Sequence, residues 1–500
     1  MELRRLGDAG LARPLTLGLS ALTALTLLRL VMAAVIPLAP DEAYYWVWSR
    51  HLQPGYLDAP PMVAVWVQVG TLIAGHTALG VRLLGPLSAA LGSVLLWRAG
   101  EALLPGRHAG LVAAALLNAT LLFGVGAVIM TPDTPLLFFW TCALWACAMF
   151  VRDGNGAWLV AAGVFAGLAL TSKYTAALLV LGIALWLIMT PSLRRRLLQP
   201  APWWGALFGA VAFAPVIEWN RAHGWASFVK QGGRVADWQR EQAARFLGEL
   251  IGGQVGLATP LVFLLCVAGI ALAVRMAWRR GDPVWTLLAA LTVPPIVIFV
   301  QHALGDRVQG NWPAIIYPAA AIAAAGLDGW LCVRLRAPAV ALGLVIVIIA
   351  YVQAVAAPIP LPVRIDPTAF RLAGWAGLAA QVEAARIQTG AAFVASDEYG
   401  EAAELAWLLP PDVPVIGVEP RWALFDLPRL DLPRPALTGP PGILVRSARR
   451  GGDMDRGAWA EVQEIGPAVR TRDTEVVERY RIYRVIARQS STPKALLPRW

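Results

Sequence analysis

The chain has 500 residues, a formal net charge of +10 and a composition in which 58% of residues are hydrophobic and only 15% are charged. Soluble globular domains carry charges on about 25% of their residues, and the mean hydropathy here is +0.59, so a soluble protein is excluded and a polytopic membrane protein is expected. The basic residues stand in short runs between apolar segments, as cytoplasmic anchors do, which argues against nucleic acid as a partner.

Eleven apolar stretches are long enough to be expected as membrane-spanning helices. In chain order they cover residues 15–39, 78–98, 109–130, 134–151, 157–172, 174–190, 202–219, 249–274, 284–302, 313–332 and 338–357. Residues 61–75 are also apolar but short and begin at the proline pair Pro60 and Pro61, which predicts a helix that lies in the membrane interface or re-enters the membrane without spanning it. The arginines before residue 15 are followed by no convincing cleavage site, so the first stretch is expected to stay as a helix.

The basic loops predict the orientation of these helices. With a cytoplasmic N-terminus, the inside loops are short and arginine-bearing, as the positive-inside rule requires: Arg98–His108, Arg152–Gly156, Pro191–Pro200, Arg275–Pro283 and Cys332–Pro338. The outside segments then hold aspartate, glutamate, histidine, asparagine and tryptophan: Asp41–Pro61, Met130–Asp133, Ser172–Lys173, Asn220–Gly248 and His302–Asn311. The orientation rests on the basic loops alone, yet the residues suited to chemistry all fall on the other face.

After residue 357 the composition changes. Three prolines form a linker, and residues 358–500 are more polar. Short apolar runs at 391–395, 413–418, 442–445 and 480–486 predict strands, and 401–409 predicts a helix. We therefore expect a transmembrane module over residues 1–357 and a small α/β domain over residues 358–500, on the outer side.

The first outside loop offers three carboxylates, Asp41, Glu42 and Asp58, among many aromatic residues that include Tyr56. A carboxylate at a membrane boundary can take the proton of an acceptor hydroxyl, and a second one can orient the acceptor or hold a divalent cation. Loop carboxylates are also commonly just solvated, and the aromatic residues fit an interfacial belt. The loop by itself leaves both interpretations open.

Several motifs in order resemble those of bacterial GT-C glycosyltransferases. They read DEAYYW and GYLDAPPM in the first loop, then TPDTPLLFFW, SKYT, EWN with HGW and QGGR, and GDRVQGNWP. This pattern, over about residues 35–330, is similar to that of protein O-mannosyltransferases and of the aminoarabinose transferase that modifies lipid A. The resemblance implies a GT-C fold of about eleven transmembrane helices with a small C-terminal extracytoplasmic domain.

The resemblance also implies roles at matching positions. Asp41, in the acidic pair with Glu42, is the expected catalytic base, and Asp58 would orient the acceptor or the base. Relatives often carry a histidine or lysine directly after that second acid, whereas this chain has Ala59. Another cation must then contact the donor phosphate, and Lys173 is the expected substitute, although a lysine at a helix end can also simply reach toward the interface.

The remaining expected site residues lie in the other outside segments. Arg234 and Arg307 would join Lys173 at the donor phosphate, since arginine offers a bidentate fork for such groups. The expected substrate-binding residues are Tyr56, Asp133, Glu218, Asn220, His223, Asn311 and Trp312. Asp133 could instead cap its helix, and two distant histidines make a weak case for a metal.

These expectations combine into an inverting transferase. It would move a sugar from a polyprenyl-phosphate donor to a glycan, lipid or protein acceptor of the envelope, at the periplasmic face of a bacterial inner membrane. No cofactor is demanded by the pattern, and a divalent cation stays open, as do the sugar and the acceptor. A transporter or flippase of lipid-linked sugars is the alternative. Such a protein would place ionisable residues inside its helices, whereas the charged groups of this chain gather at one face. A membrane scaffold with an external binding domain would explain the tail but not the loop motifs.

Overall fold

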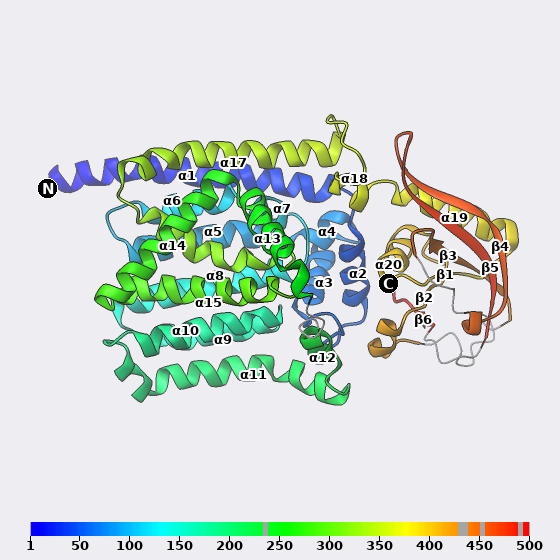
Figure 1. Ribbon diagram of the computed structural model, residues 1–500, viewed down its shortest axis with the longest axis horizontal. Helices are drawn as coiled ribbons and strands as arrows, with labels where there is room; N and C mark the ends of the chain where they lie inside the picture. Colours follow the sequence, from blue (N-terminus) through cyan, green and yellow to red (C-terminus); the bar gives the residue numbers. More distant parts are fainter. Residues whose placement is uncertain (1, 234–238, 429–438, 451–455, 489–493, 500) are drawn as a thin grey trace. The chain divides into compact units, whose positions relative to one another are not determined.

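The computed structural model describes residues 2–233, 239–428, 439–450, 456–488 and 494–499 (Figure 1). The chain forms two compact units. The helical unit comprises Met1–Ala34, Asp58–Val63 and Arg82–Tyr351, and the sheet unit comprises Val35–Leu57, Ala64–Val81 and Val352–Trp500. The division near residue 352 lies close to the expected boundary at 357. The sheet unit, however, also takes in most of the first loop, which the sequence had placed with the transmembrane module.

The helical unit consists of long helices that run back and forth along a common direction (Figure 1). They are α1 (Glu2–Val35), α5 (Leu84–Leu103), α6 (Ala109–Asn118), α7 (Leu121–Gly126), α8 (Asp133–Asp153), α9 (Ala157–Leu170), α10 (Ala177–Met189), α11 (Pro200–Ala222), α12 (Ala226–Gly233), α13 (Ala243–Leu257), α14 (Pro260–Arg280), α15 (Pro283–Ala303), α16 (Tyr317–Ala325) and α17 (Trp330–Ala356). Short 3-10 turns accompany them at η1 (Tyr174–Ala176), η2 (Arg194–Leu198), η3 (Arg240–Gln242) and η4 (Trp312–Ile316).

Seven helices among the described residues are long and apolar enough to cross a membrane. They cover Leu15–Val35, Ala78–Leu103, Asp133–Asp153, Pro200–Ala222, Pro260–Arg280, Pro283–Ala303 and Trp330–Ala356. Five shorter apolar helices add to them, at Met62–Ala74, Ala109–Asn118, Ala157–Leu170, Tyr174–Met189 and Trp312–Ala325. Each of the eleven expected stretches thus contains apolar helix, and the segment expected at 61–75 is a short helix of its own, α3 (Met62–Ala74).

Several expected stretches are interrupted in the structure, and two of the breaks have a clear local cause. Residues 249–274 are divided between α13 and α14, because Pro260 cannot continue a helix and Thr259 before it has a φ of +66°. Residues 109–130 are divided at Thr120, whose hydroxyl caps α7 by accepting from Phe123 N at 3.1 Å.

The loop expected at 332–338 was also wrong. Residues 332–338 lie inside α17, which accommodates Pro338, and the connection before that helix is residues 326–329. Proline is tolerated within long apolar helices where neighbouring groups satisfy the freed carbonyl.

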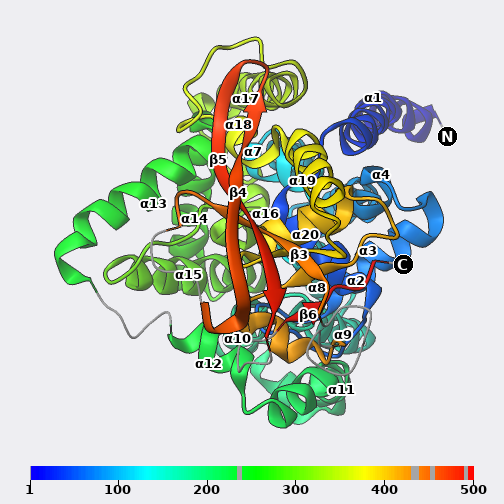
Figure 2. The ribbon, with the colours of Figure 1, turned by 90° about the vertical axis from the view of Figure 1, so that its right-hand side faces the viewer.

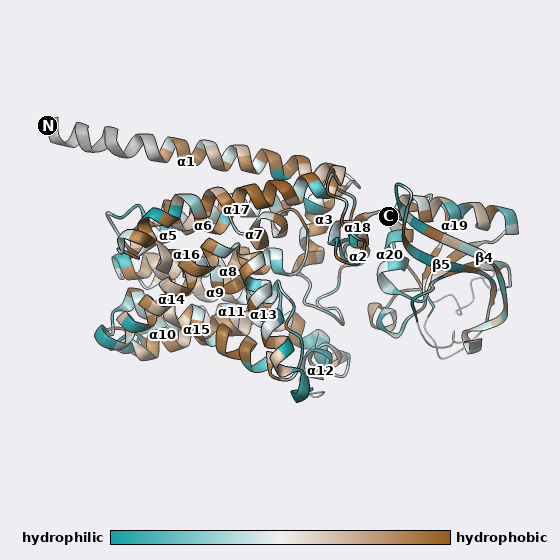
Figure 3. Ribbon diagram, turned by 45° about the horizontal axis from the view of Figure 1, so that its top comes forward, coloured by the Kyte–Doolittle hydropathy of each residue, from teal (hydrophilic) through white to brown (hydrophobic). Residues whose placement is uncertain are grey.

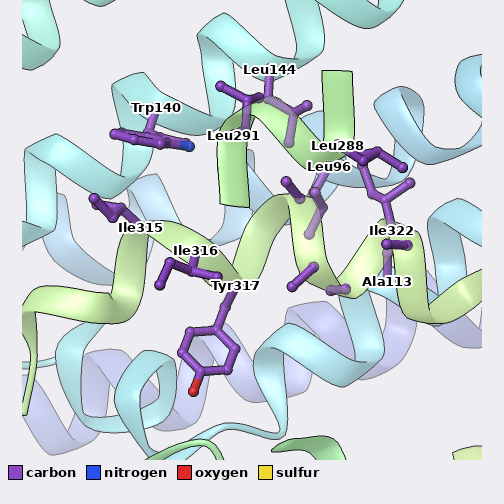
Figure 4. Close-up of a cluster of buried hydrophobic side chains, with 14 of the residues drawn as sticks. Leu96, Ala113, Trp140, Leu144, Leu288, Leu291, Ile315, Ile316, Tyr317 and Ile322 are labelled. Carbon is purple, nitrogen blue, oxygen red and sulfur yellow. The ribbon is translucent and has the colours of Figure 1, made fainter. Parts of the chain in front are cut away.

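The core of the helical unit is mostly apolar, although it also buries polar side chains such as Arg29, which donates to Asn118 at 2.9 Å. Figure 4 shows Trp140 and Leu144 of α8 close to Leu291 of α15, with the η4 and α16 residues below them. Leu96, Trp140, Leu144, Leu288 and Leu291 are fully buried. Hydropathic colouring shows apolar residues along the helices and polar residues gathered near their ends (Figure 3). The helix lengths therefore suit an apolar medium, with chemistry confined to the connections.

Helices α9 and α11 touch through paired glycines. Gly163 and Gly167 on α9 face Gly205 and Gly209 on α11, each pair four residues apart. A Cβ added at Gly163 would lie 2.3 Å from the Gly205 backbone, and one added at Gly167 would lie 2.4 Å from Gly209 O. Such small-xxx-small pairs allow close backbone approach between membrane helices.

The helix directions sort the connections into two ends of this unit. One end has the turns at 104–108, 154–156, 190–199, 281–282 and 326–329, with arginine at or beside each. Arg107 there contacts Asp328 at 2.7 Å, which joins two of these turns. The opposite end, called here the polar end, has residues 130–132, 171–176, 223–233 and 304–311. The expected separation of arginine-bearing turns from the chemically interesting ones is therefore confirmed within this unit.

The sheet unit is built on a six-stranded mixed sheet in the order β4-β5-β3-β1-β2-β6 (Figure 2). The strands are β1 (Phe393–Ser396), β2 (Val415–Gly417), β3 (Pro441–Ser447), β4 (Trp459–Arg472), β5 (Glu475–Ala487) and β6 (Ala495–Leu496). Parallel pairing of β1 with β2 and β3 and the helices α19 (Trp375–Thr389) and α20 (Tyr399–Leu408) confirm an α/β arrangement. The other helical segments are α2 (Pro40–Arg50), α3, α4 (Ala78–Arg82), α18 (Pro367–Leu372), η5 (Pro420–Phe425) and η6 (Arg456–Ala458).

The predicted strands and helix of this region are present, but β4 was missed. Its burial alternates irregularly, and most of its residues reach solvent, so no apolar run marks it. It is held by antiparallel pairing with β5, which supplies its hydrogen bonds without requiring a hydrophobic sequence.

Candidate active site

The first cluster at the polar end of the helical unit is centred on Lys173, just beyond α9. Its ammonium donates to both carboxylate oxygens of Asp133, at 2.7 and 2.9 Å, in the first turn of α8. Asn311 Nδ2 donates to the same carboxylate at 2.6 Å, and the ammonium lies 5.9 Å from the centre of the Trp312 ring. The side chains of Lys173 and Asp133 are 19% and 17% exposed, so the pair is largely shielded yet reachable. Asp133, Lys173, Asn311 and Trp312 are called the Lys173 cluster below.

Three helix ends thus bring these residues together. The sequence had predicted that all of them lie on the same face of the membrane. The carboxylate of Asp133 does not cap its own helix; it neutralises a cation from another element. Because a lone lysine at the end of apolar helices is costly unless paired, the partner explains how the charge is kept there.

A second lysine lies against Asp58, which also belongs to the helical unit. The Lys230 ammonium of α12 forms an ion pair with the Asp58 carboxylate, and these side chains are 28% and 19% exposed. Gln231 Nε2 donates to Asp58 O at 2.8 Å. Asp58 and Lys230 are called the Lys230 pair.

The segment that carries Asp58 is anchored to the same end of the unit as Lys173. Met62 N donates to Thr171 O at 3.0 Å, two residues before Lys173. Tyr174 directly follows Lys173, and its hydroxyl is hydrogen-bonded to the hydroxyl of Ser227 in α12 at 2.8 Å. Backbone and side-chain bonds therefore tie both lysine–carboxylate pairs to one end of the helices.

Asp41 lies in the first turn of α2, in the sheet unit, with both carboxylate oxygens engaged. Its Oδ1 accepts from the Tyr399 hydroxyl at 2.9 Å, and its Oδ2 accepts from Arg371 Nη1 at 3.2 Å. The side chain is 36% exposed, so an acceptor can approach it from solvent. Burial and the neighbouring Asp41 carboxylate raise the pKa of Tyr399 above its ordinary value, so the phenol keeps its proton and donates.

Glu42, the other member of the acidic pair, points inward. It is fully buried, and its Oε2 accepts from Ala39 N at 3.0 Å. This bond satisfies a free amide at the start of α2. The geometry gives the two acids different surroundings, a solvent-reachable one for Asp41 and a buried capping one for Glu42.

Tyr56 is fully buried and stacks on Trp48 with ring centres 4.0 Å apart. Its hydroxyl lies 3.1 Å from the carbonyl oxygens of Trp48 and His51, and burial raises its pKa. These contacts hold the turn after α2 in place, so a direct substrate contact predicted for Tyr56 finds no exposed surface here.

The remaining predicted residues are spread along the polar end. Asn220 is fully buried and donates to Val216 O at 3.0 Å and to the Tyr174 hydroxyl at 3.4 Å. His223 stacks on Trp219 and shares a hydrogen bond of 2.8 Å with its carbonyl oxygen. Glu218 is exposed and bound to Arg221 at 2.6 Å.

Two arginines were predicted to contact the donor phosphate. Arg307 is 63% exposed and pairs with Glu249 of α13 at 2.8 Å. Arg234 lies outside the described residues. In the part of the chain that the structure describes, no group of three or more histidine, cysteine, aspartate or glutamate side chains is arranged to hold a metal ion.

Sequence reasoning assigned no role to Arg371 and Tyr399, and it grouped Lys230 only with the loop residues that could clamp a phosphate and a sugar. Lys230 had one signal, since lysine is rare in this arginine-rich chain and this one follows the HGW motif. Arg371 and Tyr399 had none, because they lie more than 300 residues from Asp41.

Comparison with known proteins agrees with this architecture. Residues 58–219 match the family described as dolichyl-phosphate-mannose-protein mannosyltransferase. The chain is similar to the lipid A galacturonosyltransferase RgtD of Rhizobium johnstonii, with 28% identity over 291 residues, which is 57% of this chain and 60% of that protein. The match thus spans less than two thirds of the relative's length.

Two crystal structures of ArnT from Cupriavidus metallidurans share the fold. The form bound to undecaprenyl phosphate matches with a TM-score of 0.63 and 16% identity, and the apo form with 0.60 and 18%. Each match covers 93% of this chain and 97% of the other. The chain therefore has the GT-C fold, and its residues 58–219 are similar to the dolichyl-phosphate-mannose-protein mannosyltransferase family.

Proposed function

We propose that this protein is an inverting glycosyltransferase that moves a sugar from a polyprenyl-phosphate carrier to an envelope acceptor. The observation that carries the proposal is the Lys173 cluster, a shielded cation at the polar end of a long apolar helical unit. A lipid phosphate has the matching form, an apolar tail with an anionic head. Its tail would lie along the apolar helices while its phosphate meets the cations at their end.

Two lysines are available for the leaving phosphate. Lys173 and Lys230 each lie beside one carboxylate, so each cation is held in place before the substrate arrives. Charge that develops on the departing phosphate is best stabilised by such preorganised groups. Relatives often carry a cationic residue directly after the second acid, where this chain has Ala59. Lys230, which pairs with Asp58, would supply that cation instead. Arg307 and Arg234 are of secondary importance in this scheme.

Asp41 acts as the base. Its carboxylate takes the proton of the acceptor hydroxyl while the hydroxyl oxygen forms a bond to the anomeric carbon of the sugar. The bond between that carbon and the phosphate oxygen breaks, and the electron pair leaves with the polyprenyl phosphate. One base and one displacement, with no covalent intermediate, invert the configuration.

The proposed side and acceptor follow from charge and from the relatives. Arginines mark the opposite end of the helical unit, which the positive-inside rule assigns to the cytoplasm, so the polar end would face the periplasm of a bacterial inner membrane. RgtD is named for lipid A, and one ArnT structure contains undecaprenyl phosphate. A lipid A or related envelope glycan is therefore the first acceptor to examine, before other lipids and proteins.

Mass spectrometry of lipids and glycans tests this proposal. Cells lacking the gene are compared with cells complemented by the wild type, by Asp41→Asn, or by Asp328→Asn as a control at the arginine-bearing end. We expect the deletion and Asp41→Asn strains to accumulate a polyprenyl-phosphate sugar and to lose one sugar mass from an envelope glycan. The wild type and Asp328→Asn should restore both. Unchanged lipids and glycans in every strain would refute the transferase and make transport the next activity to assay.

A further inference from the structure

Among the described residues, two side chains of the C-terminal region hold the carboxylate proposed as the base. Arg371 belongs to α18 and Tyr399 is the first residue of α20, and each donates to a different oxygen of Asp41. Both donors lie in the same compact unit as α2. An ionised carboxylate can accept about four hydrogen bonds, so these two leave room for an acceptor hydroxyl.

The Tyr399 ring is itself fixed on several sides. It packs edge-on against Tyr44 of α2, with ring centres 4.7 Å apart, and the Arg421 guanidinium lies 3.9 Å from its centre. Glu398 caps α20 by accepting from Glu401 N at 2.6 Å, which sets the backbone from which Tyr399 projects. The hydroxyl therefore has little freedom to leave Asp41.

Helix α20 approaches α2 closely at the same place. A Cβ at Gly400 would lie 2.8 Å from Pro40 Cβ, next to Asp41 in the chain, so a larger residue would push the helices apart. Farther along, Trp46 and Trp407 meet edge-on with ring centres 5.0 Å apart. The contact is thus a packed interface within the sheet unit, and the Tyr399–Asp41 bond is one part of it.

We propose that Tyr399 and Arg371 are positioning residues that hold the Asp41 carboxylate in the orientation needed for proton abstraction, so that the C-terminal α/β region is part of the catalytic apparatus. The inference rests on the proposed role of Asp41. Tyr399 holds one oxygen through a neutral donor and Arg371 the other through a cation. A carboxylate free to rotate would spend less time aligned with the acceptor hydroxyl, which lowers the rate of the chemical step but not donor binding.

The test uses the purified full-length protein in detergent, with the lipid-linked sugar that accumulates in the deletion strain as donor. Tyr399→Phe removes only the hydroxyl and keeps the ring packing; Arg371→Gln removes the cation, and Arg371→Lys restores it. Matched controls in the same unit are Tyr483→Phe and Arg386→Gln. We expect Tyr399→Phe and Arg371→Gln each to lower kcat about ten-fold, with KM for the donor within about two-fold. Arg371→Lys should recover part of the loss, and both controls should match the wild type.

Asp41→Asn separates failure of this inference from failure of the proposed function. If Asp41→Asn is inactive while Tyr399→Phe and Arg371→Gln keep the wild-type kcat, the positioning role is wrong and the base stands. Active Asp41→Asn protein would remove the base and the positioning role together. A loss shared equally with Tyr483→Phe, or one confined to donor KM, would also overturn the inference, because it would reflect general destabilisation or binding.

Discussion

Lys173 Nζ lies 2.7 Å from Asp133 Oδ1 and 2.9 Å from Oδ2, although the two residues are 40 positions apart in the chain. Helix α8 begins at Asp133 and α9 ends just before Lys173, so the short turn at the other end of this helix pair brings both charges to the polar end. The ion pair holds a shielded cation next to Trp312 and Asn311. Four consequences of the architecture can be measured.

Replacing Lys173 tests the proposed phosphate site. Lys173→Gln removes the charge that stabilises the leaving phosphate, and we expect kcat/KM to fall by about 10- to 100-fold, as when one charge-assisted contact is lost. Lys173→Arg keeps the charge but changes its geometry, so it should retain intermediate activity. Transfer is measured with the accumulated lipid-linked sugar. Arg107→Gln, in the exposed pair with Asp328 at the arginine-bearing end, is the control and should leave transfer unchanged.

The Lys230 pair predicts coupled effects on stability. Asp58→Asn and Lys230→Gln each leave a partly buried charge without its ion-pair partner, whereas the double variant removes both charges. The melting temperature of the double variant should therefore fall by less than the sum of the two single falls. Expressed as free energies of unfolding, the coupling between the two residues should be on the order of 1 kcal/mol. Thermal unfolding in detergent measures all three. Strictly additive falls would show that the pair is not coupled.

The glycine contact between α9 and α11 predicts a site intolerant of even one methyl group. Gly163→Ala would place a Cβ 2.3 Å from the Gly205 backbone, so the helices must separate. We expect the free energy of unfolding to fall by about 2 kcal/mol or more. Gly248→Ala in α13 is the matched control, because its Cβ would meet nothing within 4 Å. That change should be neutral or stabilise the helix by up to about 1 kcal/mol. Equal melting temperatures for the two variants would contradict the packing.

Glu401 predicts a pH dependence of the sheet unit. Its side chain is fully buried near Glu398, Asp397 and Glu478, and burial followed by those charges raises its pKa well above the ordinary value. A carboxyl whose pKa is raised in the folded state binds more protons in that state than in the unfolded state. Its contribution to stability is therefore fully present below about pH 4.5 and is lost as the pH rises through the folded-state pKa. Glu401→Gln removes this loss.

The measurement is hydrogen exchange of the α20 amides in the full chain as a function of pH. Glu401→Gln should protect α20 better than the wild type at pH 8, and the difference should shrink toward pH 4.5. Glu383→Gln on α19, an acid paired with Arg386 at 2.7 Å, is the control and should show no such trend. A constant difference across this range would indicate that Glu401 does not titrate as described.

The loop motifs alone are enough to place most of the candidate residues at one end of the helices. Asp133, Lys173, Asn311 and Trp312 were each predicted to face the same side, and the structure joins them in one cluster. What the sequence could not indicate is which charge meets which. Lys230 pairs with a carboxylate 172 positions before it, and only the path of the helices decides that distance.

The errors have local causes that particular residues explain. The break at Thr259 and Pro260 was readable, because proline ends a helix, but the apolar run around it suggested one continuous span. Strand β4 had no readable pattern, because its partner β5 and not its own side chains defines it. The paired glycines of α9 and α11 were visible at their four-residue spacing but indicate a contact only once the two helices are known to be neighbours.

The sequence by itself determined the membrane class, most helices, the α/β character of the C-terminal region and the end at which the polar motifs gather. These follow from composition, hydrophobic length and charge, which are local properties of the chain. Only the tertiary structure decided that Asp41 is held by Tyr399 and Arg371 and that Glu42 is buried as a cap. These contacts either join residues hundreds of positions apart or depend on the direction in which a side chain points. Both are determined by the packing of the folded chain.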